Sequence, residues 1–407
     1  MAIISVLRGL VGTVSLLAAT WACAAPMVVL VGLDGFRADY LSRGHAPVLA
    51  EMAQTGAVSE GLIPSFPSLT FPNHVTLVTG RLTQKHGIVN NNMSDPQNPT
   101  QRFRLSDRAA VMNPFWWSES LPIWVSAERQ GLRTATLFWP GSEALIQGVQ
   151  PTRWLPYQHD LNPQQRVDLL LSWLREDQAK PPAFVTLYFS QVDSAGHAGG
   201  PSSERVNASI QEVDQAIGRF REGLQTMGLL ENTVFVVVAD HGMADTPVDK
   251  VIYGPGLLKG FPGVRWEWTG ATSGLNLGGE SEEAVLKALS AQKEITCWPK
   301  RSIPERLGGG QHRRIPDIVC MGTRGWTVTD RSVSFPIPGQ HGFDPADPEM
   351  HGILLVQGPG IPVKPLPRIS NLEVYGLLCH LIGMEPAPND GTGLLVRLLT
   401  EKPKSAK

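Results

Sequence analysis

The chain alternates between short apolar runs and longer stretches that are apolar on one side only. An unbroken run such as MVVLVGL at residues 27–33 is typical of a strand that is buried on both faces of a sheet. Similar runs follow at residues 133–139, 183–189, 233–239 and 352–356. Each of these five runs predicts a buried strand.

The clearest helix prediction covers residues 202–227. Apolar side chains there recur alternately four and three positions apart, which places them on one face of a helix. They are Val206, Ile210, Val213, Ile217, Phe220 and Leu224. Gly228 stands where a helix C-cap is expected, and residues 164–174 and 282–289 predict further helices.

Alternation of strands and helices favours an α/β fold with a mainly parallel central sheet that helices flank on both faces. We interpret residues 26–400 as one domain built on this sheet. The stretch from about 279 to 328 is richer in Gly, Arg and Pro, which indicates a small inserted subdomain or cap. In an open parallel sheet, ligands bind at the carboxyl ends of the strands.

The composition of the 407 residues is that of a globular protein, with 42% hydrophobic and 18% charged residues. The formal net charge is −2, and the chain contains no run of Lys or Arg. A long nucleic acid needs a basic surface for its phosphates, so we expect a small-molecule substrate instead. No obligate protein partner is evident.

Residues 1–25 predict a signal peptide. Arg8 precedes an apolar stretch from Leu10 to Ala22, and Ala22-Cys23-Ala24 fits a small-x-small cleavage pattern. A retained membrane anchor and lipid attachment at Cys23 are the alternatives, but the apolar stretch is shorter than the ~20 residues of a membrane span. We therefore expect a periplasmic or secreted protein with no membrane span after cleavage.

Three cysteines remain after such a cleavage, namely Cys297, Cys320 and Cys379. At most one disulfide can form among them, and Cys297 could pair with either of the other two. No CxxC pair is present, so any metal ion would be held by histidines and carboxylates.

Three of the predicted strands lead to an aspartate: Asp34, Asp193 and Asp240. One such carboxylate alone could simply cap the next helix. Two of the three have histidines close by, however, because His197 lies four residues after Asp193 and His241 directly follows Asp240.

A third histidine, His341, stands in a Gly-Gln-His-Gly stretch whose glycines would let the backbone approach a bound ion. Three carboxylates and three imidazoles are enough to hold two divalent ions, and this mixture of nitrogen and oxygen donors suits catalytic zinc. Two such ions can clamp both oxygens of an in-line phosphoryl displacement.

A hydroxyl nucleophile is expected nearby, and the candidates are Ser65, Ser68 and Thr70. Pro72 suits the first position of a helix that would continue from Asn73 to Gly80. Thr70 would then lie just before a helix N-terminus, where the positive end of the helix dipole favours an alkoxide and a phosphate. The alternative is that Thr70 is only a helix-entry residue.

Eight short stretches of the chain carry a resemblance to a known family. They are VGLDGFR at 31–37, TFPNH at 70–74, TG at 79–80, HGI at 86–88, DSAGHAGG at 193–200, ADHGM at 239–243, HGFD at 341–344 and GPG at 358–360. They resemble the motifs of the nucleotide pyrophosphatase/phosphodiesterase family, which belongs to the alkaline phosphatase superfamily. The resemblance extends from about residue 27 to residue 390, with all elements in order.

The resemblance implies an alkaline phosphatase-like fold, a phosphodiesterase catalytic domain at 26–400 and two zinc ions per subunit. It implies that Asp193, His197 and His341 hold one ion. Asp34, Asp240 and His241 would hold the other, to which Thr70 would be coordinated as nucleophile.

The resemblance further implies that Asn91 donates to a phosphate oxygen, although it stands in a row of three asparagines. Phe71 resembles the aromatic residue that stacks on the nucleobase, and Tyr157 its partner on the other face. Trp139 is expected to line the same pocket. For aromatic residues like these, packing in the core is the alternative.

The implied activity is hydrolysis of nucleotide pyrophosphate or phosphodiester bonds, which releases a nucleoside 5′-monophosphate through a covalent threonine intermediate. A lysophospholipid or choline-type phosphodiesterase and a phosphonate hydrolase are the main alternatives. A phosphomonoesterase would need more positive charge, and Arg37 is the only basic residue inside the ligand motifs. A secreted binding protein without catalysis is the last alternative.

Overall fold

The computed structural model describes residues 25–119, 121–331 and 337–401, and its centre is an eight-stranded sheet. β1 (Met27–Leu33) lies in the middle and pairs in parallel with β8 (Phe184–Phe189) on one side and β9 (Thr233–Val238) on the other. In spatial order the strands are β19 (Lys364–Leu366), β2 (Ala57–Ser59), β18 (Leu354–Gln357), β9 (Thr233–Val238), β1 (Met27–Leu33), β8 (Phe184–Phe189), β6 (Thr134–Leu137) and β7 (Arg153–Trp154). The five predicted strands are confirmed, and only β18 runs antiparallel to its neighbours.

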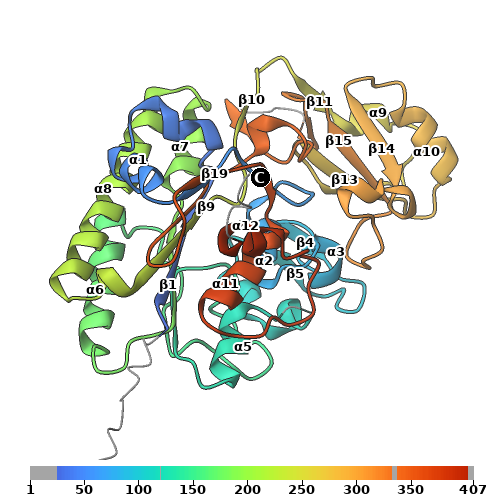
Figure 1. Cartoon of the computed structure of the whole chain (residues 1–407). Coiled ribbons are helices and arrows are strands. Elements are labelled where there is room, and N and C mark those ends of the chain that lie inside the picture. Colours follow the sequence, from blue (N-terminus) through green and yellow to red (C-terminus); the bar gives the residue numbers. More distant parts are fainter. Residues whose placement is uncertain (1–24, 120, 332–336, 402–407) are drawn as a thin grey trace, which may run out of the picture.

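Helices cover both faces of this sheet, as Figure 1 shows. On β1, Val28 and Leu30 face one core, whereas Val29 and Val31 face the other. The first core contains side chains of α2 (Thr70–Thr79), α5 (Ile123–Arg129), α11 (Leu372–Leu381) and α12 (Leu394–Thr400). The second contains side chains of α1 (Pro47–Gln54), α6 (Pro163–Glu176) and α8 (Glu204–Thr226). Apolar layers on both faces explain why the strands read as unbroken apolar runs.

The long helix predicted at 202–227 is α8, and all six residues of its apolar stripe are fully buried. The side chain of Ser203 accepts a hydrogen bond from the backbone of Val206 and caps the N-terminus. Gly228 follows with φ +70°, a conformation that favours glycine. The predicted ends are therefore correct to within two residues.

The helix that carries the candidate nucleophile begins earlier than predicted. α2 begins at Thr70, so Pro72 is its third residue rather than its first. Leu69 is extended and its carbonyl accepts from the backbone N–H of Asn73, which closes the first turn. Pro72 fits this turn because the first N–H groups of a helix have no partner within it.

A second, four-stranded antiparallel sheet packs beside the main one (Figure 1). Its order is β12 (Arg265–Trp268), β13 (Thr272–Asn276), β15 (Ile318–Gly322) and β14 (Ile295–Pro299), and α10 (Glu282–Leu289) covers it. A separate hydrophobic cluster extends from Ile252 to Val328. This unit includes most of the 279–328 stretch but starts before it, because β12 and β13 precede residue 279.

A disulfide joins Cys297 on β14 to Cys320 on β15, which face each other across the antiparallel pair. The pairing that the sequence leaves open is therefore Cys297 with Cys320, and Cys379 is buried in α11 as a free thiol. The predicted signal peptide, with Cys23, lies outside the described residues except for its last position. Among the helices in the described part of the chain, none has the length and apolar character that crossing a membrane requires.

Candidate active site

The six predicted metal ligands lie together at the carboxyl edge of the main sheet. Asp34 directly follows β1, and Asp240 and His241 follow β9. Asp193 and His197 lie one turn apart on α7 (Gln191–Gly199), the helix that follows β8. Neighbouring parallel strands thus deliver residues from three distant parts of the chain to one place.

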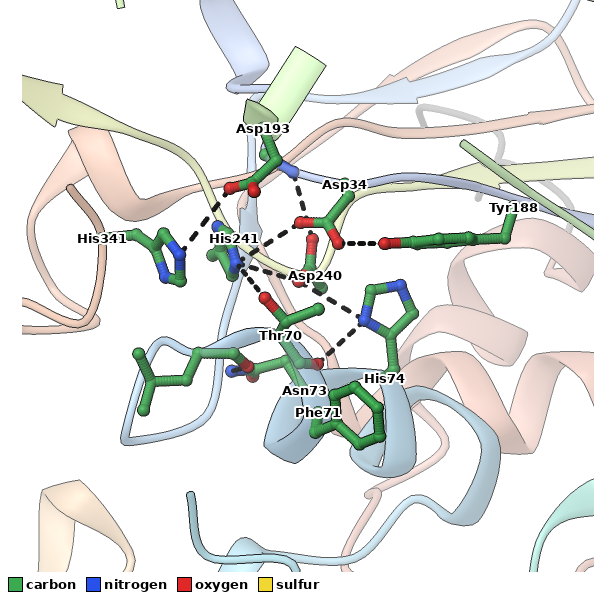
Figure 2. A network of polar contacts seen from close by, with 12 residues as sticks. Asp34, Thr70, Phe71, Asn73, His74, Tyr188, Asp193, Asp240, His241 and His341 are labelled. Carbon is green, nitrogen blue, oxygen red and sulfur yellow. Dashed lines mark hydrogen bonds and ion pairs between the residues drawn. The ribbon is translucent and has the colours of Figure 1, made fainter. Parts of the chain in front are cut away.

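His341 reaches the same place by a different route. It follows β17 (Gly339–Gln340), which pairs with β10 (Ala244–Asp245) just beyond His241. Figure 2 shows His341 on one side of His241 and the carboxylates of Asp193, Asp34 and Asp240 beside them.

We call Asp34, Asp240 and His241 the inner half of the cluster. The Nε2 atom of His241 lies 3.0 Å from Oδ2 of Asp240 and 3.6 Å from Oδ1 of Asp34. The Thr70 hydroxyl lies 3.3 Å from the same Nε2 atom. The candidate nucleophile therefore faces the inner half directly.

We call Asp193, His197 and His341 the outer half. Oδ1 of Asp193 lies 3.4 Å from Nε2 of His197 and 3.7 Å from Nε2 of His341. The rings of His241 and His341 stack with centroids 3.6 Å apart, so the two halves are adjacent. Ligand atoms of Asp193, Asp34 and His241 also lie within 4.8 Å of one another, so Asp193 is close enough to the inner half to share an ion with it.

All three histidines present the same atom to the cluster. Their Nδ1 atoms lie 2.8–2.9 Å from backbone carbonyls, those of Gly339 for His197, Ser68 for His341 and Gly242 for His241. A carbonyl oxygen only accepts, so each Nδ1 carries the proton. In the neutral rings the Nε2 lone pairs then face carboxylate oxygens, an arrangement that a bound cation stabilises.

The buried carboxylates point to the same conclusion. Oδ1 of Asp34, Oδ1 of Asp193 and Oδ2 of Asp240 are buried without a hydrogen-bond partner within the described structure. Burial raises the pKa of Asp34 well above its usual value, and the charges of Asp240 and Asp193 raise it further. Burial likewise raises the pKa of Asp193, against the lowering effect of His197 and His241. Unpaired buried carboxylates are costly unless they coordinate a metal, so the residues present fit divalent cations.

The other pKa shifts follow from the same crowding. Burial would raise the pKa of Asp240, but His241 and His74 together lower it well below its usual value. Burial lowers the pKa of His341 well below the usual value, with His241 and His197 adding to the effect. Burial also acts to lower the pKa of His241, but Asp240 outweighs it and the pKa is raised.

Two further residues of the cluster were not predicted from the sequence. The Tyr188 hydroxyl donates to Oδ2 of Asp34 at 2.6 Å, and Nδ1 of His74 lies 3.4 Å from Oδ2 of Asp240. Tyr188 belongs to the apolar run of β8, so nothing in the sequence indicated a polar role for it. His74 stands inside the TFPNH stretch, and its spacing of four from Thr70 on a helix was the available signal.

A cavity of about 580 Å³ opens onto this cluster, and Thr70 lines it together with the predicted substrate residues Phe71, Asn91, Trp139 and Tyr157. Trp139 is only 2% exposed, and its indole N–H donates to the carbonyl of His74. Oδ1 of Asn91 accepts from the backbone of Phe71 at 2.8 Å, which makes the amide NH₂ group the donor end of that side chain.

The other two candidate hydroxyls are engaged elsewhere. Ser65 is hydrogen-bonded to Asn371 at 2.9 Å, and Ser68 donates to the carbonyl of Phe343 at 3.0 Å. Both serines are buried and neither is among the residues that line the cavity. Of the three hydroxyls, Thr70 is the one that lies between the cavity and the carboxylates.

Glycines near the cluster allow close backbone packing. A Cβ atom at Gly339 would lie 2.3 Å from the carbonyl oxygen of Gly196, and one at Gly35 would lie 2.8 Å from the Asp193 backbone. These glycines let α7 pack closely against its neighbours, which brings Asp193 and His197 to the cluster.

The fold and this cluster define an α/β protein with a candidate metal centre at the carboxyl edge of its sheet. The chain belongs to the type I phosphodiesterase/nucleotide pyrophosphatase family, whose family model matches residues 28–344. The family resemblance of the sequence motifs is thereby confirmed.

Curated relatives agree with this assignment. The chain is 35% identical over 387 residues to ectonucleotide pyrophosphatase/phosphodiesterase family member 3 of Bos taurus, covering 92% of this chain and 44% of the relative. It is 34% identical to an uncharacterised pyrophosphatase/phosphodiesterase of Schizosaccharomyces pombe (90% and 78%) and 34% identical to a venom phosphodiesterase of Crotalus durissus collilineatus (91% and 46%). The chain thus spans less than half the length of the bovine and venom relatives.

Solved structures extend the agreement to the fold. Murine ectonucleotide pyrophosphatase/phosphodiesterase 5 superposes with a TM-score of 0.85 at 30% identity, covering 92% of this chain and 99% of the murine chain. A second structure of that murine protein, an inactive threonine-to-alanine variant in complex with AMP, gives a TM-score of 0.86 at 29% identity with the same coverage. The predicted α/β, alkaline phosphatase-like fold is confirmed.

Proposed function

We propose that this chain hydrolyses phosphodiester and pyrophosphate bonds of nucleotides and releases nucleoside 5′-monophosphates. The observation that carries the proposal is the position of Thr70. Its hydroxyl lies 3.3 Å from His241 within the carboxylate–histidine cluster and lines a cavity that also contains Phe71 and Tyr157. The names of the relatives, pyrophosphatases and phosphodiesterases, support this reaction class.

Two zinc ions are the proposed cofactors. The inner half, with Thr70, would hold one ion, and the outer half would hold the other. Bound zinc would supply Lewis-acid stabilisation of phosphoryl oxygens and favour the deprotonated form of a coordinated hydroxyl. The mixture of carboxylate and imidazole ligands, and the tautomers set by the Nδ1 contacts, suit this metal.

Thr70 acts as the nucleophile in the proposed reaction. Its Oγ1 atom loses its proton to solvent and attacks phosphorus as the bond from phosphorus to the leaving oxygen breaks. A phosphothreonine diester results, and the leaving oxygen takes a proton. A water molecule then attacks phosphorus, the bond to Oγ1 breaks and Thr70 is protonated again. The inactive threonine-to-alanine variant of the murine relative supports an essential threonine.

The surrounding side chains hold the substrate. Thr70 is the first residue of α2, so the helix N-terminus adds partial positive charge beside the phosphoryl group. The Asn91 amide would donate to a phosphoryl oxygen, an interaction typically worth ~3 kcal/mol in the transition state. Phe71 and Tyr157 would hold a planar base between them, and the AMP in the murine relative supports a nucleotide in this cavity.

The position of Arg37 gives a phosphomonoesterase no support, although Arg108 lines the same cavity as Thr70. Its guanidinium donates to the Asp39 carboxylate and to the carbonyl of Met243, and it lines a separate shallow depression with Glu349. Arg37 therefore does not supply the additional charge that a phosphate monoester dianion would require at Thr70.

We further propose an extracytoplasmic location. The apolar N-terminal stretch predicts a signal peptide, and the Cys297–Cys320 disulfide is of the kind that persists in oxidising compartments. Mass spectrometry of the N-terminus of the protein recovered from its native compartment would identify the cleavage site near residue 25.

A substrate panel on zinc-loaded protein tests the proposed function. We expect p-nitrophenyl-dTMP to be hydrolysed faster than p-nitrophenyl phosphorylcholine and p-nitrophenyl phosphate, by roughly 100-fold or more in kcat/KM. Elemental analysis should find two zinc ions per chain. A preference for phosphorylcholine would overturn the nucleotide assignment, and a lack of hydrolysis of any diester would overturn the reaction class.

A further inference from the structure

His74 is a buried side chain of the cluster to which the proposed reaction assigns no role. It lies one turn after Thr70 on α2 and is only 1% exposed. Its Nδ1 atom is 2.8 Å from the carbonyl oxygen of Thr70 and 3.4 Å from Oδ2 of Asp240. Figure 2 shows dashed lines from one nitrogen of this ring to both groups.

The two groups beside Nδ1 determine that this nitrogen is protonated. A carbonyl oxygen and a carboxylate oxygen accept hydrogen bonds, so Nδ1 must carry the hydrogen. The shorter contact is a hydrogen bond to Thr70. The longer one leaves Oδ2 of Asp240 without a hydrogen bond but places a positive N–H dipole against it. Nδ1 is therefore already engaged with the protein backbone and is a poor candidate for a metal ligand.

Packing holds the ring in this orientation. The imidazole makes edge contacts with the rings of Trp139 and Tyr188, at centroid distances of 4.8 and 5.2 Å. The indole N–H of Trp139 donates to the carbonyl of His74 at 3.1 Å. Because Trp139 and Tyr188 contact the ring and Trp139 also binds the His74 carbonyl, the imidazole has little freedom to move away from the Thr70 carbonyl.

We infer that His74 is a positioning residue that sets the distance between the nucleophile and a metal ligand. Thr70 and Asp240 are 170 positions apart in the chain and belong to different elements, α2 and the end of β9. The Nδ1–H group is a common neighbour of the backbone of one and the carboxylate of the other. Without it, the first turn of α2 and the Asp240 carboxylate would lose one of the contacts that connect them, and a misplacement of about 1 Å can cost 100-fold in rate.

This inference rests on the proposed function, and two substitutions test it. His74→Leu removes the N–H group, whereas His74→Asn places an amide N–H close to the original Nδ1 position. We expect the leucine variant to lower kcat for p-nitrophenyl-dTMP by about 10- to 100-fold with KM changed less than about threefold. Its zinc affinity, measured by competition with a chromophoric chelator, should fall about tenfold for the tighter ion. The asparagine variant should recover both quantities to within about fivefold.

His351→Leu is the matched control, because His351 is another buried histidine, 3% exposed, whose ring contacts a backbone carbonyl, that of Pro345, away from the catalytic cavity. It should leave kcat and zinc affinity unchanged. Thermal melting of all three variants separates loss of folding from loss of positioning. The inference is overturned if the leucine variant has wild-type kcat and zinc affinity, or if the asparagine variant is impaired equally. If wild-type protein hydrolyses no diester, the proposed function fails, but the zinc measurements still decide the role of His74.

Discussion

The inner and outer halves of the ligand cluster differ in exposure although they use the same residue types. In the inner half, the side chains of Asp34, Asp240 and His241 are at most 2% exposed. In the outer half, the Asp193 side chain is 16% exposed and that of His197 32%, whereas that of His341 is 6% exposed. One half is sealed in the core of the protein, and the other opens toward solvent.

The two halves also differ in the groups that support them. Tyr188 donates to Asp34, His74 faces Asp240, and the backbone N–H of Gly35 donates to the other oxygen of Asp240. The outer histidines contact the backbone carbonyls of Gly339 and Ser68. Supporting side chains fix a ligand and raise metal affinity. In the proposed reaction, the inner half would therefore hold its ion and the nucleophile rigidly, whereas the outer half would exchange water and the leaving group.

The largest expected effect is that of removing the nucleophile from the inner half. Thr70→Ala should lower kcat for p-nitrophenyl-dTMP by at least about three orders of magnitude, because the covalent step is lost. Zinc content should remain near that of wild type, since the carboxylates and histidines stay in place. Steady-state kinetics and elemental analysis of the same preparation measure both.

Ser65→Ala is the matched control, because it removes a buried hydroxyl that does not line the cavity. It should retain most of the wild-type activity. Equal activity in Thr70→Ala and Ser65→Ala would show that Thr70 is not the nucleophile. The proposal that the inner half positions a nucleophile would then be wrong.

A smaller effect is expected for the difference in zinc affinity between the two halves. Titration of zinc-loaded protein with a chelator should release the two ions in separate steps. The outer ion should leave at a chelator concentration at least about tenfold lower than that which releases the inner ion. His197→Ala should abolish the first step and leave the second. Elemental analysis after gel filtration measures the zinc retained at each chelator concentration, and release of both ions in a single step would contradict the difference between the halves.

The same contrast shows what sequence reasoning can reach. The strands and the stripe of α8 are local patterns, and ligands at strand ends converge because parallel strands end at one edge of a sheet. Asp34 and Asp240 could therefore be placed from the strands alone. His341 follows a two-residue strand, and only its Gly-Gln-His-Gly stretch marked it, because a loop position depends on a distant pairing such as that of Gly339 with Asp245.

Other features had no local signal. Leu69 caps α2 without a side-chain hydrogen bond, so the sequence lacks the usual marker of that helix start. The partner of Cys297 depends on the register of β14 against β15, which only the folded sheet defines. Tyr188 reads as one more apolar strand residue, and its role becomes visible only when its hydroxyl is found 2.6 Å from Asp34.

Tyr188→Phe should have the smallest effect of the series and sharpens the comparison most directly. It removes one hydroxyl and keeps the ring that packs against His74 and Tyr157. Asp34 would lose a hydrogen bond to its charged form, an interaction worth ~1.5–3 kcal/mol in general. Because a bound cation would partly compensate, we expect zinc affinity of the inner half to fall by about tenfold or less and kcat by a few-fold. In the chelator titration the second step should move toward the first, while the first step stays in place. If the first step moved instead, Tyr188 would support the outer half, and the assignment of side-chain support to the inner half would be wrong.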